Sequence, residues 1–238
     1  MRMRKTILAT ALLLPMGFVS VHQEEPATDP YEKVLENEYV RVSKLDFDTQ
    51  QLRESNTKLP EPGLATAATA VILVEQFTKA EWTELGSNHL TFKFVDASFA
   101  EEGQKLSRNM HDFRGPVFRE IKIEFRGLPP MSPFEKDAVK LDPKHNEVLF
   151  ENDRVRVVRV HFGLGASGPM VDKRPRVIIL LTDTHAQVRR PDGQLSPRDS
   201  VAGTIQWSLG GRQATINGNV GPLENIVVEL KGADAKGK

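Results

Sequence analysis

Hydrophobic residues occur in short runs, or at every second position, along most of the chain. In the second half, apolar runs at 177–181, 204–209 and 226–230 have the length of strands, and turn residues such as Pro-Asp-Gly at 191–193 separate them. Helical periodicity is nearly absent. The pattern therefore predicts an all-β protein.

Three segments of the first half recur in the same order in the second half. LENEYVRV at 35–42 and FENDRVRV at 150–157 are identical at five of eight positions. The two further pairs are 69–74 with 175–180 and 120–127 with 225–232. Three matches in one order predict two copies of a single structural unit.

The first repeated strand changes its alternation part-way along. Val155 and Val157 give way to Val160 and Phe162, and the first copy changes in the same way after Val42. A shared slip of one residue predicts a β-bulge in this strand, or a strand that crosses between two sheets. Asn37 and Asn152 recur just before the two strands, where their side-chain oxygens are expected to close turns.

The first residues have the layout of an export signal. Three basic residues precede an apolar run at 7–21, and no acidic residue occurs before Glu24. At about 15 residues the run is short for a membrane-spanning helix, which needs about 20. We therefore expect a signal peptide at 1–22 and a secreted or periplasmic protein, with an uncleaved anchor as the alternative.

The repeat also predicts where the domains begin and end. The two copies give a first domain at 29–127 and a second at 142–232, joined by a proline-containing linker at 128–141. The Lys- and Gly-rich end, 233–238, is expected to be a disordered tail.

Charge and composition limit the partners. The chain has 32 basic and 32 acidic residues, and loss of the signal would leave a net charge of −3. Nucleic acid, and a membrane after signal cleavage, are therefore not expected partners. Cysteine is absent, which excludes thiol catalysis and thiolate metal sites. The oligomeric state stays open, and a homo-oligomer is allowed.

The second copy resembles the cupin family at three places. Residues 149–160 are similar to the opening strand of the family, 175–183 followed by 191–193 to the next hairpin, and 211–231 to the closing segment. The resemblance implies a tandem pair of jelly-roll barrels, as in secreted bicupins. It also implies a divalent metal bound by two histidines one residue apart, a glutamate and a third histidine.

The metal-binding pattern of the family is not present in this sequence. The paired histidine positions fall on Val171 and Lys173, and the closing histidine falls on Gln213, although Asn217 occupies the asparagine that usually follows. An ammonium ~4 Å from a divalent ion is repelled by about 8 kcal/mol at an effective dielectric near 20. The corresponding stretch of the first copy, 58–70, contains no histidine. We therefore expect no metal and no cofactor.

The same positions suggest a different ligand. Lys173, Arg176, Gln213 and Trp207 are the predicted ligand-binding residues, because cations and an amide in an apolar cup suit a carboxylate, a phosphate or a cluster of sugar hydroxyls. The alternative is that Lys173 reaches the rim while apolar side chains, including Trp207, fill the interior.

Two further groups of residues have competing interpretations. Asp183 and His185 lie two apart and would form a general-base pair, as in metal-free epimerases of the superfamily, or Asp183 would close a turn. Arg154, Arg156 and Arg159 would bind an acidic partner or form a solvated strand face.

The sequence as a whole predicts an exported, metal-free bicupin that binds a sugar or organic anion or serves a structural role, with no catalytic residue assigned. The alternative is a cupin enzyme. It would be either a metal-independent epimerase or a metal-dependent oxygenase or isomerase with rearranged ligands.

Overall fold

The computed structural model describes residues 29–49, 59, 61–77, 91–108, 115–130, 134–219 and 221–232. The predicted signal peptide and C-terminal tail lie outside these residues. Strands make up most of the described chain, and its helix is the four-residue α3 (Ala138–Leu141). The predicted all-β class is confirmed. In this part of the chain no helix has the length and apolarity to cross a membrane.

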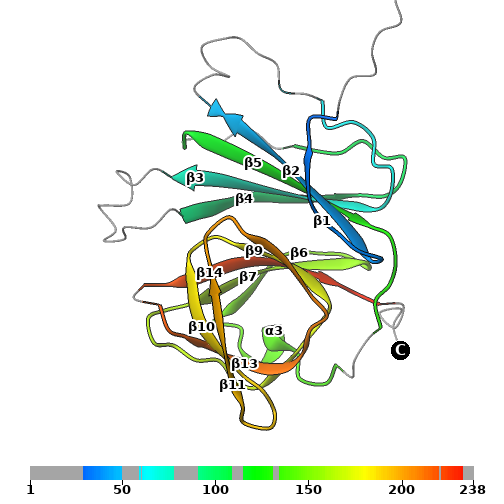
Figure 1. The fold of residues 1–238 in the computed structure, drawn as a ribbon. Coiled ribbons are helices and arrows are strands. Elements are labelled where there is room, and N and C mark those ends of the chain that lie inside the picture. The colour runs from blue at the N-terminus through cyan, green and yellow to red at the C-terminus, as the bar shows by residue number, and fades with distance from the viewer. Residues whose placement is uncertain are drawn as a thin grey trace, which may run out of the picture.

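The first half forms one antiparallel sheet with the strand order β1-β2-β5-β3-β4. Its strands are β1 (Glu32–Glu36), β2 (Val40–Asp48), β3 (Thr69–Phe77), β4 (Thr91–Ala100) and β5 (Val117–Phe125). In Figure 1 this sheet lies above the second half of the molecule.

The second half forms two facing sheets that curl into a barrel (Figure 1). The five-stranded sheet, in the order β12-β9-β14-β7-β6, consists of β6 (Asn146–Glu151), β7 (Val155–Phe162), β9 (Arg176–Leu180), β12 (Ile205–Ser208) and β14 (Leu223–Leu230). The four-stranded sheet, in the order β11-β10-β13-β8, consists of β8 (Val171–Lys173), β10 (Thr184–Arg189), β11 (Leu195–Ser200) and β13 (Gly211–Asn217).

The strand order confirms the internal duplication. The sheet β1-β2-β5-β3-β4 corresponds, strand for strand, to β6-β7-β14-β9-β12, and the three repeated sequence segments fall on equivalent strands. A counterpart of the four-stranded sheet does not occur among the described residues of the first half, where β4 pairs directly with β3. The complete two-sheet barrel is therefore seen in the second copy.

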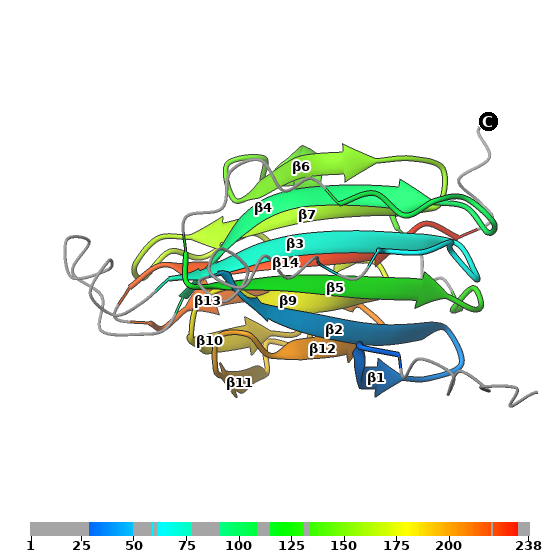
Figure 2. The ribbon, with the colours of Figure 1, turned by 90° about the horizontal axis from the view of Figure 1, so that it is seen from above.

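The two corresponding sheets pack face to face and share one hydrophobic core. Figure 1 shows the two sheets as stacked layers, and Figure 2 shows their strands running in similar directions. Fully buried side chains come from both halves, and those of the three central strands on each side are Val40, Val42, Ala70, Ile72, Val74, Ile121, Ile123, Val155, Val157, Val177, Ile179, Ile226, Val228 and Leu230. Full burial of one valine, leucine or isoleucine side chain stabilises the fold by about 1.5–3 kcal/mol. The halves therefore bury each other's apolar faces.

The change of hydrophobic alternation along the repeated strand arises neither from a bulge in that strand nor from a crossing between two sheets. The pairing of β7 with β14 runs without a shift, so β7 contains no bulge. Val155 and Val157 face the core between the halves, whereas Val158, Val160 and Phe162 face the barrel interior. The strand buries its two faces at different places along its length. A repeated bulge does exist, but in the edge strands β1 and β6, between Lys33 and Leu35 and between Val148 and Phe150.

The repeated asparagines close equivalent turns, as predicted. Asn37 Oδ1 accepts hydrogen bonds from the backbone N–H groups of Tyr39 at 2.8 Å and Val40 at 2.9 Å. Asn152 Oδ1 accepts from Arg154 and Val155, both at 2.9 Å. The same side-chain-to-backbone turn thus precedes β2 and β7.

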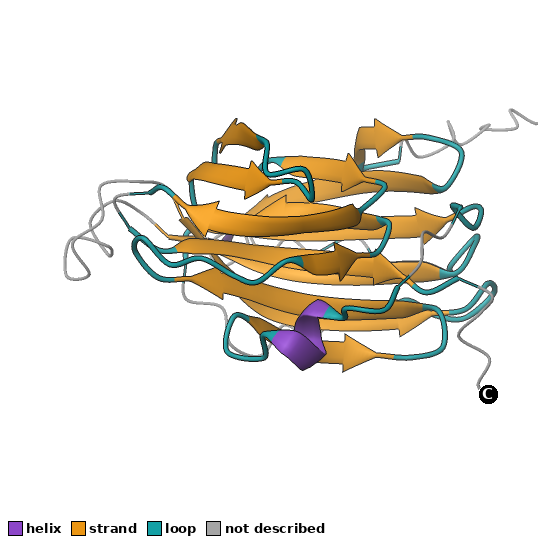
Figure 3. Ribbon diagram, turned by 90° about the horizontal axis from the view of Figure 1, so that it is seen from below, coloured by secondary structure: helices purple, strands orange, loops and turns teal. Residues whose placement is uncertain are grey.

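Residues 134–141, within the segment predicted as a linker, lie against the second barrel. The backbone N–H groups of Glu135 and Lys136 donate to Asp172 Oδ2 at 2.9 and 2.8 Å. Asp137 caps α3 by accepting from Val139 N, and it also pairs with Arg156 at 2.8 Å. Figure 3 shows the helix on the barrel side of the molecule.

Candidate ligand-binding cavity

A cavity of about 180 Å³ lies inside the second barrel, between its two sheets. It has space for roughly a dozen water-sized groups, which is the size of a small organic molecule. Its apolar lining includes Val158, Val160, Ile178, Leu223 and Val227. Strand alternation explains this lining, because every second residue of each barrel strand points inward.

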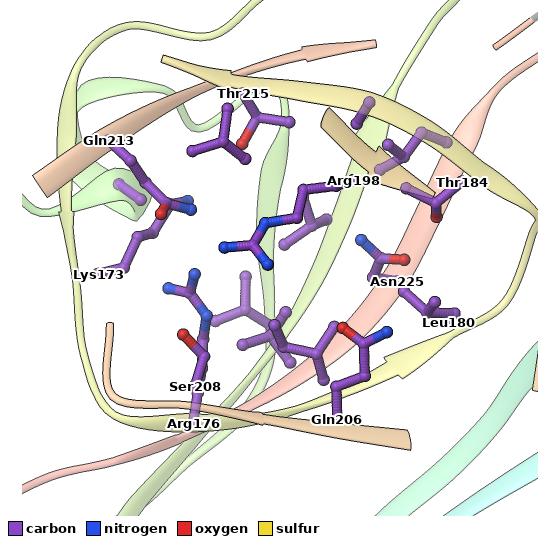
Figure 4. Close-up of a pocket in the computed structure, with 18 of the residues that line it drawn as sticks. Lys173, Arg176, Leu180, Thr184, Arg198, Gln206, Ser208, Gln213, Thr215 and Asn225 are labelled. Atoms are coloured by element: carbon purple, nitrogen blue, oxygen red, sulfur yellow. The ribbon is translucent and has the colours of Figure 1, made fainter. Parts of the chain in front are cut away.

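All four residues predicted from the sequence to bind a ligand border this cavity. Lys173 comes from β8, Arg176 from β9, Trp207 from β12 and Gln213 from β13. Figure 4 shows Lys173 and Gln213 side by side at one end. The Trp207 ring also stacks on Tyr39 of the first half, with the centroids 5.8 Å apart, so it belongs to the core between the halves as well.

The position of Lys173 is fixed by the strands on either side of it. Lys173 pairs with Gly211 across the β8–β13 ladder. At Gly210, where φ is +85°, a Cβ would lie 2.1 Å from the Lys173 carbonyl oxygen. Only glycine allows the turn between β12 and β13 to approach β8 this closely.

Several polar lining residues were not singled out in the sequence. These are Thr184, Arg198, Gln206 and Asn225. Figure 4 shows the Arg198 guanidinium reaching the middle of the cavity from β11. Its strand, LSPRDS, is short, polar and largely exposed, and nothing in it distinguishes Arg198 from a surface arginine. The β10–β11 pairing, with Arg198 opposite Ala186, brings this side chain over the cavity.

The charges in the cavity are predominantly positive. Within the described part of the chain, Lys173, Arg176 and Arg198 form no ion pair with a carboxylate. The carboxylate in the lining, Glu229, accepts hydrogen bonds from Arg156 Nε at 2.9 Å and Nη2 at 2.6 Å. The cavity lining therefore offers three cations, of which Arg198 is also exposed to solvent, and a carboxylate that another arginine already neutralises.

Burial lowers the pKa values of two of these cations. Desolvation, followed by repulsion from Arg176, lowers the pKa of Lys173 to about 8. The Arg176 side chain is 5% exposed, and desolvation lowers its pKa to about 10, with Glu229 opposing and Arg198 adding to the shift. The folded protein holds positive charge here at an electrostatic cost.

Three buried polar atoms of the cavity wall have no hydrogen-bond partner among the described residues. They are Arg176 Nε, Thr184 Oγ1 and Asn225 Oδ1. Leaving a buried donor or acceptor unsatisfied costs about 1–3 kcal/mol.

The cavity does not fit the metal that the cupin resemblance implies. Val171 pairs directly with Gln213 and lies outside the lining, and Lys173 faces the cavity as a cation. In the described ranges, no group of three or more His, Asp or Glu side chains is placed to hold a metal ion. A donor set of one lysine, two arginines and an amide suits an anion and repels a divalent cation.

The predicted Asp183–His185 pair does not form. Asp183 Oδ1 accepts a hydrogen bond from Ala202 N at 2.8 Å, and this contact joins the segment between β9 and β10 to the loop between β11 and β12. His185 points out of the barrel, because its neighbours Thr184 and Ala186 point in, and its Nδ1 lies 3.0 Å from Asp199 Oδ1. The two residues alternate with the cavity-facing side chains. The observed contact of Asp183 is also not a local turn, because Ala202 lies on a different loop and Thr184 Oγ1 has no partner among the described residues.

The three arginines considered as a docking surface have carboxylate partners within the chain. Arg154 pairs with Glu101 of the first half at 2.9 Å, and Arg159 pairs with Glu224 at 2.7 Å. Arg156 is buried, so it does not belong to a solvated strand face.

Comparisons with known proteins give structural similarity alone. No family model and no curated protein matches the chain. Similar solved structures include a cupin domain protein from Bordetella pertussis, with 17% identity over 43% of this chain and all of that one, at a TM-score of 0.35. A cupin 2 conserved barrel domain protein from Leptotrichia buccalis has 9% identity over 84% of this chain and 88% of that one, at a TM-score of 0.40.

An oxalate decarboxylase structure is similar at 9% identity, over 81% of this chain and 69% of that one, with a TM-score of 0.42. These similarities concern the fold and transfer no activity. The strand topology itself supplies the two facing antiparallel sheets that the sequence resemblance implies. The two-sheet jelly-roll barrel is therefore confirmed for the second half of the chain.

Proposed function

We propose that the protein is an exported binding module whose second barrel takes up a small organic anion. The observation that supports this is the set of three cations, Lys173, Arg176 and Arg198, that surround an interior cavity without carboxylate partners in the described chain. A carboxylate is the natural ligand, because arginine binds it with two parallel hydrogen bonds.

The electrostatics favour an anion over a neutral sugar. A bound carboxylate offsets the repulsion among the three cations and accepts hydrogen bonds from their N–H groups. A sugar hydroxyl supplies the hydrogen bond without the charge. Hydrogen bonds to charged groups contribute about 1.5–3 kcal/mol, roughly twice the contribution of neutral ones.

Isothermal titration calorimetry with a panel of small ligands tests this proposal. Succinate, malate, glucuronate and phosphate are compared with glucose as the neutral reference. At least one anion is expected to bind, and Arg176→Gln is expected to weaken that binding by about tenfold or more. Arg189→Gln is the matched control, because Arg189 lies on β10 and points away from the cavity.

Two outcomes would overturn the anion-binding proposal. One is heat of binding from glucose alone, and the other is equal affinity of wild type and Arg176→Gln for every anion. Thermal unfolding of each variant in the absence of ligand shows whether a loss of binding is a loss of folding.

Export is part of the same proposal and rests on the basic and apolar N-terminal sequence. Expression of the full chain in a bacterium is expected to give a protein in the periplasm or medium whose intact mass corresponds to cleavage near residues 20–23. A full-length protein retained in the membrane fraction would support the uncleaved anchor instead.

A further inference from the structure

We propose that Lys173 forms a covalent imine with its ligand, and that the ligand class is a small 2-oxo acid, a molecule with a carbonyl group beside a carboxylate. This inference rests on the proposed function, since the arginines of the cavity would hold the carboxylate end. It goes beyond anion binding because it assigns chemical reactivity to a named amine.

The first support is the placement of the amine. Lys173 ends the three-residue strand β8 and projects into the cavity beside Gln213 (Figure 4). Its neighbour Asp172 points the other way, accepting from Arg212 Nε at 2.6 Å and from two backbone N–H groups. These contacts hold Asp172 on the outer face of β8. Because adjacent residues of a strand point to opposite faces, the Lys173 side chain points into the barrel.

The second support is the charge around the amine. Arg176 and Arg156 disfavour its ammonium form, whereas Glu229 and Asp142 favour it, and desolvation is the largest influence on its pKa. Arg198 adds a further cation to the same cavity. With the pKa of Lys173 at about 8, roughly a tenth of the amine is neutral at pH 7 and half at pH 8. A free lysine with an ordinary pKa near 10.4 is almost entirely protonated at these pH values.

The third support is the arrangement of groups for a bifunctional ligand. Arg176 follows Lys173 by three residues, on the opposite sheet, and both border the same cavity. A carboxylate bound by Arg176 and Arg198 would lie in the same cavity as the Lys173 amine. Thr184 and Asn225 on the far side supply polar groups for a second substituent.

The reaction is a condensation and needs no oxidant or reductant. The lone pair of the neutral Lys173 Nζ attacks the carbonyl carbon, and a carbon–nitrogen bond forms as the carbonyl π bond breaks. The resulting carbinolamine loses its oxygen as water, which carries away both amine hydrogens, and a carbon–nitrogen double bond remains. Hydrolysis reverses the step, so the cavity would capture its ligand reversibly.

Reductive trapping with intact-mass analysis tests the imine. The purified full chain is incubated with pyruvate or 2-oxoglutarate and sodium cyanoborohydride, which reduces an imine to a stable secondary amine. One adduct per chain is expected, peptide mapping should place it on Lys173, and Lys173→Met should abolish it. Lys140→Met, at an exposed lysine of α3, is the matched control and should label like wild type.

The pH dependence of trapping gives a second readout. The initial rate is expected to rise almost tenfold from pH 6 to pH 7 and to level off above pH 8, because it follows the neutral amine. A rate that keeps rising through pH 9.5, as for ordinary surface lysines, contradicts the proposal.

Calorimetry with succinate, which has no carbonyl group, separates this inference from the proposed function. Succinate binding by wild type is measured beside reductive trapping of wild type with pyruvate. If wild type binds succinate but gives no Lys173 adduct, the imine is wrong and anion binding stands. If neither succinate nor the oxo acids bind, both are wrong. Adducts spread over surface lysines also overturn the imine.

Discussion

Lys173 and Arg176 illustrate how two like charges come together at the scale of single residues. They are three positions apart in the sequence but belong to opposite sheets of the barrel, and the short connection between β8 and β9 brings both side chains to one cavity. Placing them there lowers the pKa values of both groups through desolvation. Such a cost at a cavity wall is typical of functional sites.

We predict that Lys173 makes the unliganded protein more stable as the pH rises above about 8. The pKa of Lys173 is about 8 in the folded protein and near its ordinary value of 10.5 in the unfolded chain, so between these pH values the unfolded chain binds more protons. The free energy of unfolding therefore rises with pH in this window. Urea unfolding at several values between about pH 7 and pH 9.5 measures it.

Lys173→Met provides the comparison, because it removes this titration and leaves the others in place. Relative to the variant, wild type should gain stability as the pH increases. A constant difference between the two proteins across the window would show that the pKa of Lys173 is not lowered.

The sequence identified four residues of the cavity wall at this scale but not the others. Lys173 and Gln213 were found because they occupy positions where the cupin pattern has histidines. Arg198 carried no such mark, since its exposed strand looks like any polar hairpin. Its role depends on how β11 folds over the cavity, and local sequence does not encode that placement.

At the scale of elements, hydrogen bonds from side chains hold the ends of the barrel strands together. Asn217, at the end of β13, is 2% exposed and donates through Nδ2 to three carbonyl oxygens, those of Phe162, Gly163 and Gly221, at 2.9–3.1 Å. Its Oδ1 accepts from Asn219 N at 2.8 Å. One side chain thus joins the end of β7 to the loop before β14.

Replacement of Asn217 by alanine is expected to destabilise the protein by about 1–3 kcal/mol. The change removes a donor from the buried Phe162 carbonyl and the partly buried Gly221 carbonyl, and it leaves the buried Asn219 N–H without its acceptor. The Gly163 carbonyl still accepts from Ala166 N. Chemical denaturation measures the loss. Gln187→Ala, on the exposed side of β10, is the control and should change stability by less than about 0.5 kcal/mol.

A small effect of Asn217→Ala would mean that water replaces the side chain at little cost. In either case anion affinity should persist at temperatures where the variant is folded, because Asn217 does not line the cavity.

At the scale of the whole molecule, the two copies stabilise each other through their shared core. Beyond the apolar side chains, Phe92 N of β4 donates to the Leu181 carbonyl at 2.8 Å, and Arg119 Nη1 donates to the Gly203 carbonyl at 3.1 Å. Separation of the halves would expose both apolar sheet faces to water. We therefore expect the chain to fold as one cooperative unit.

The predicted consequence is that Ile179→Ala destabilises both halves together, by about 2–5 kcal/mol. Ile179 is 1% exposed and faces the first sheet from the centre of β9, so truncation leaves a cavity between the halves. Tryptophan fluorescence and far-UV circular dichroism should report a single, coincident transition at a lower denaturant concentration. Two separated transitions would show instead that the halves unfold independently.

The sequence by itself determined the all-β class, the duplication, the repeated asparagine turns, and the lysine and glutamine at two of the three histidine positions. Each of these follows from the local alternation of hydrophobic and polar residues or from a short sequence motif. Tertiary structure decided the rest. It showed that β2 and β7 bury their two faces at different places along their length, that His185 points out of the barrel, and that Arg198 points into it. Which face of a strand is buried depends on the sheet that packs against it. That contact forms between strands far apart in the chain, so local sequence does not specify it.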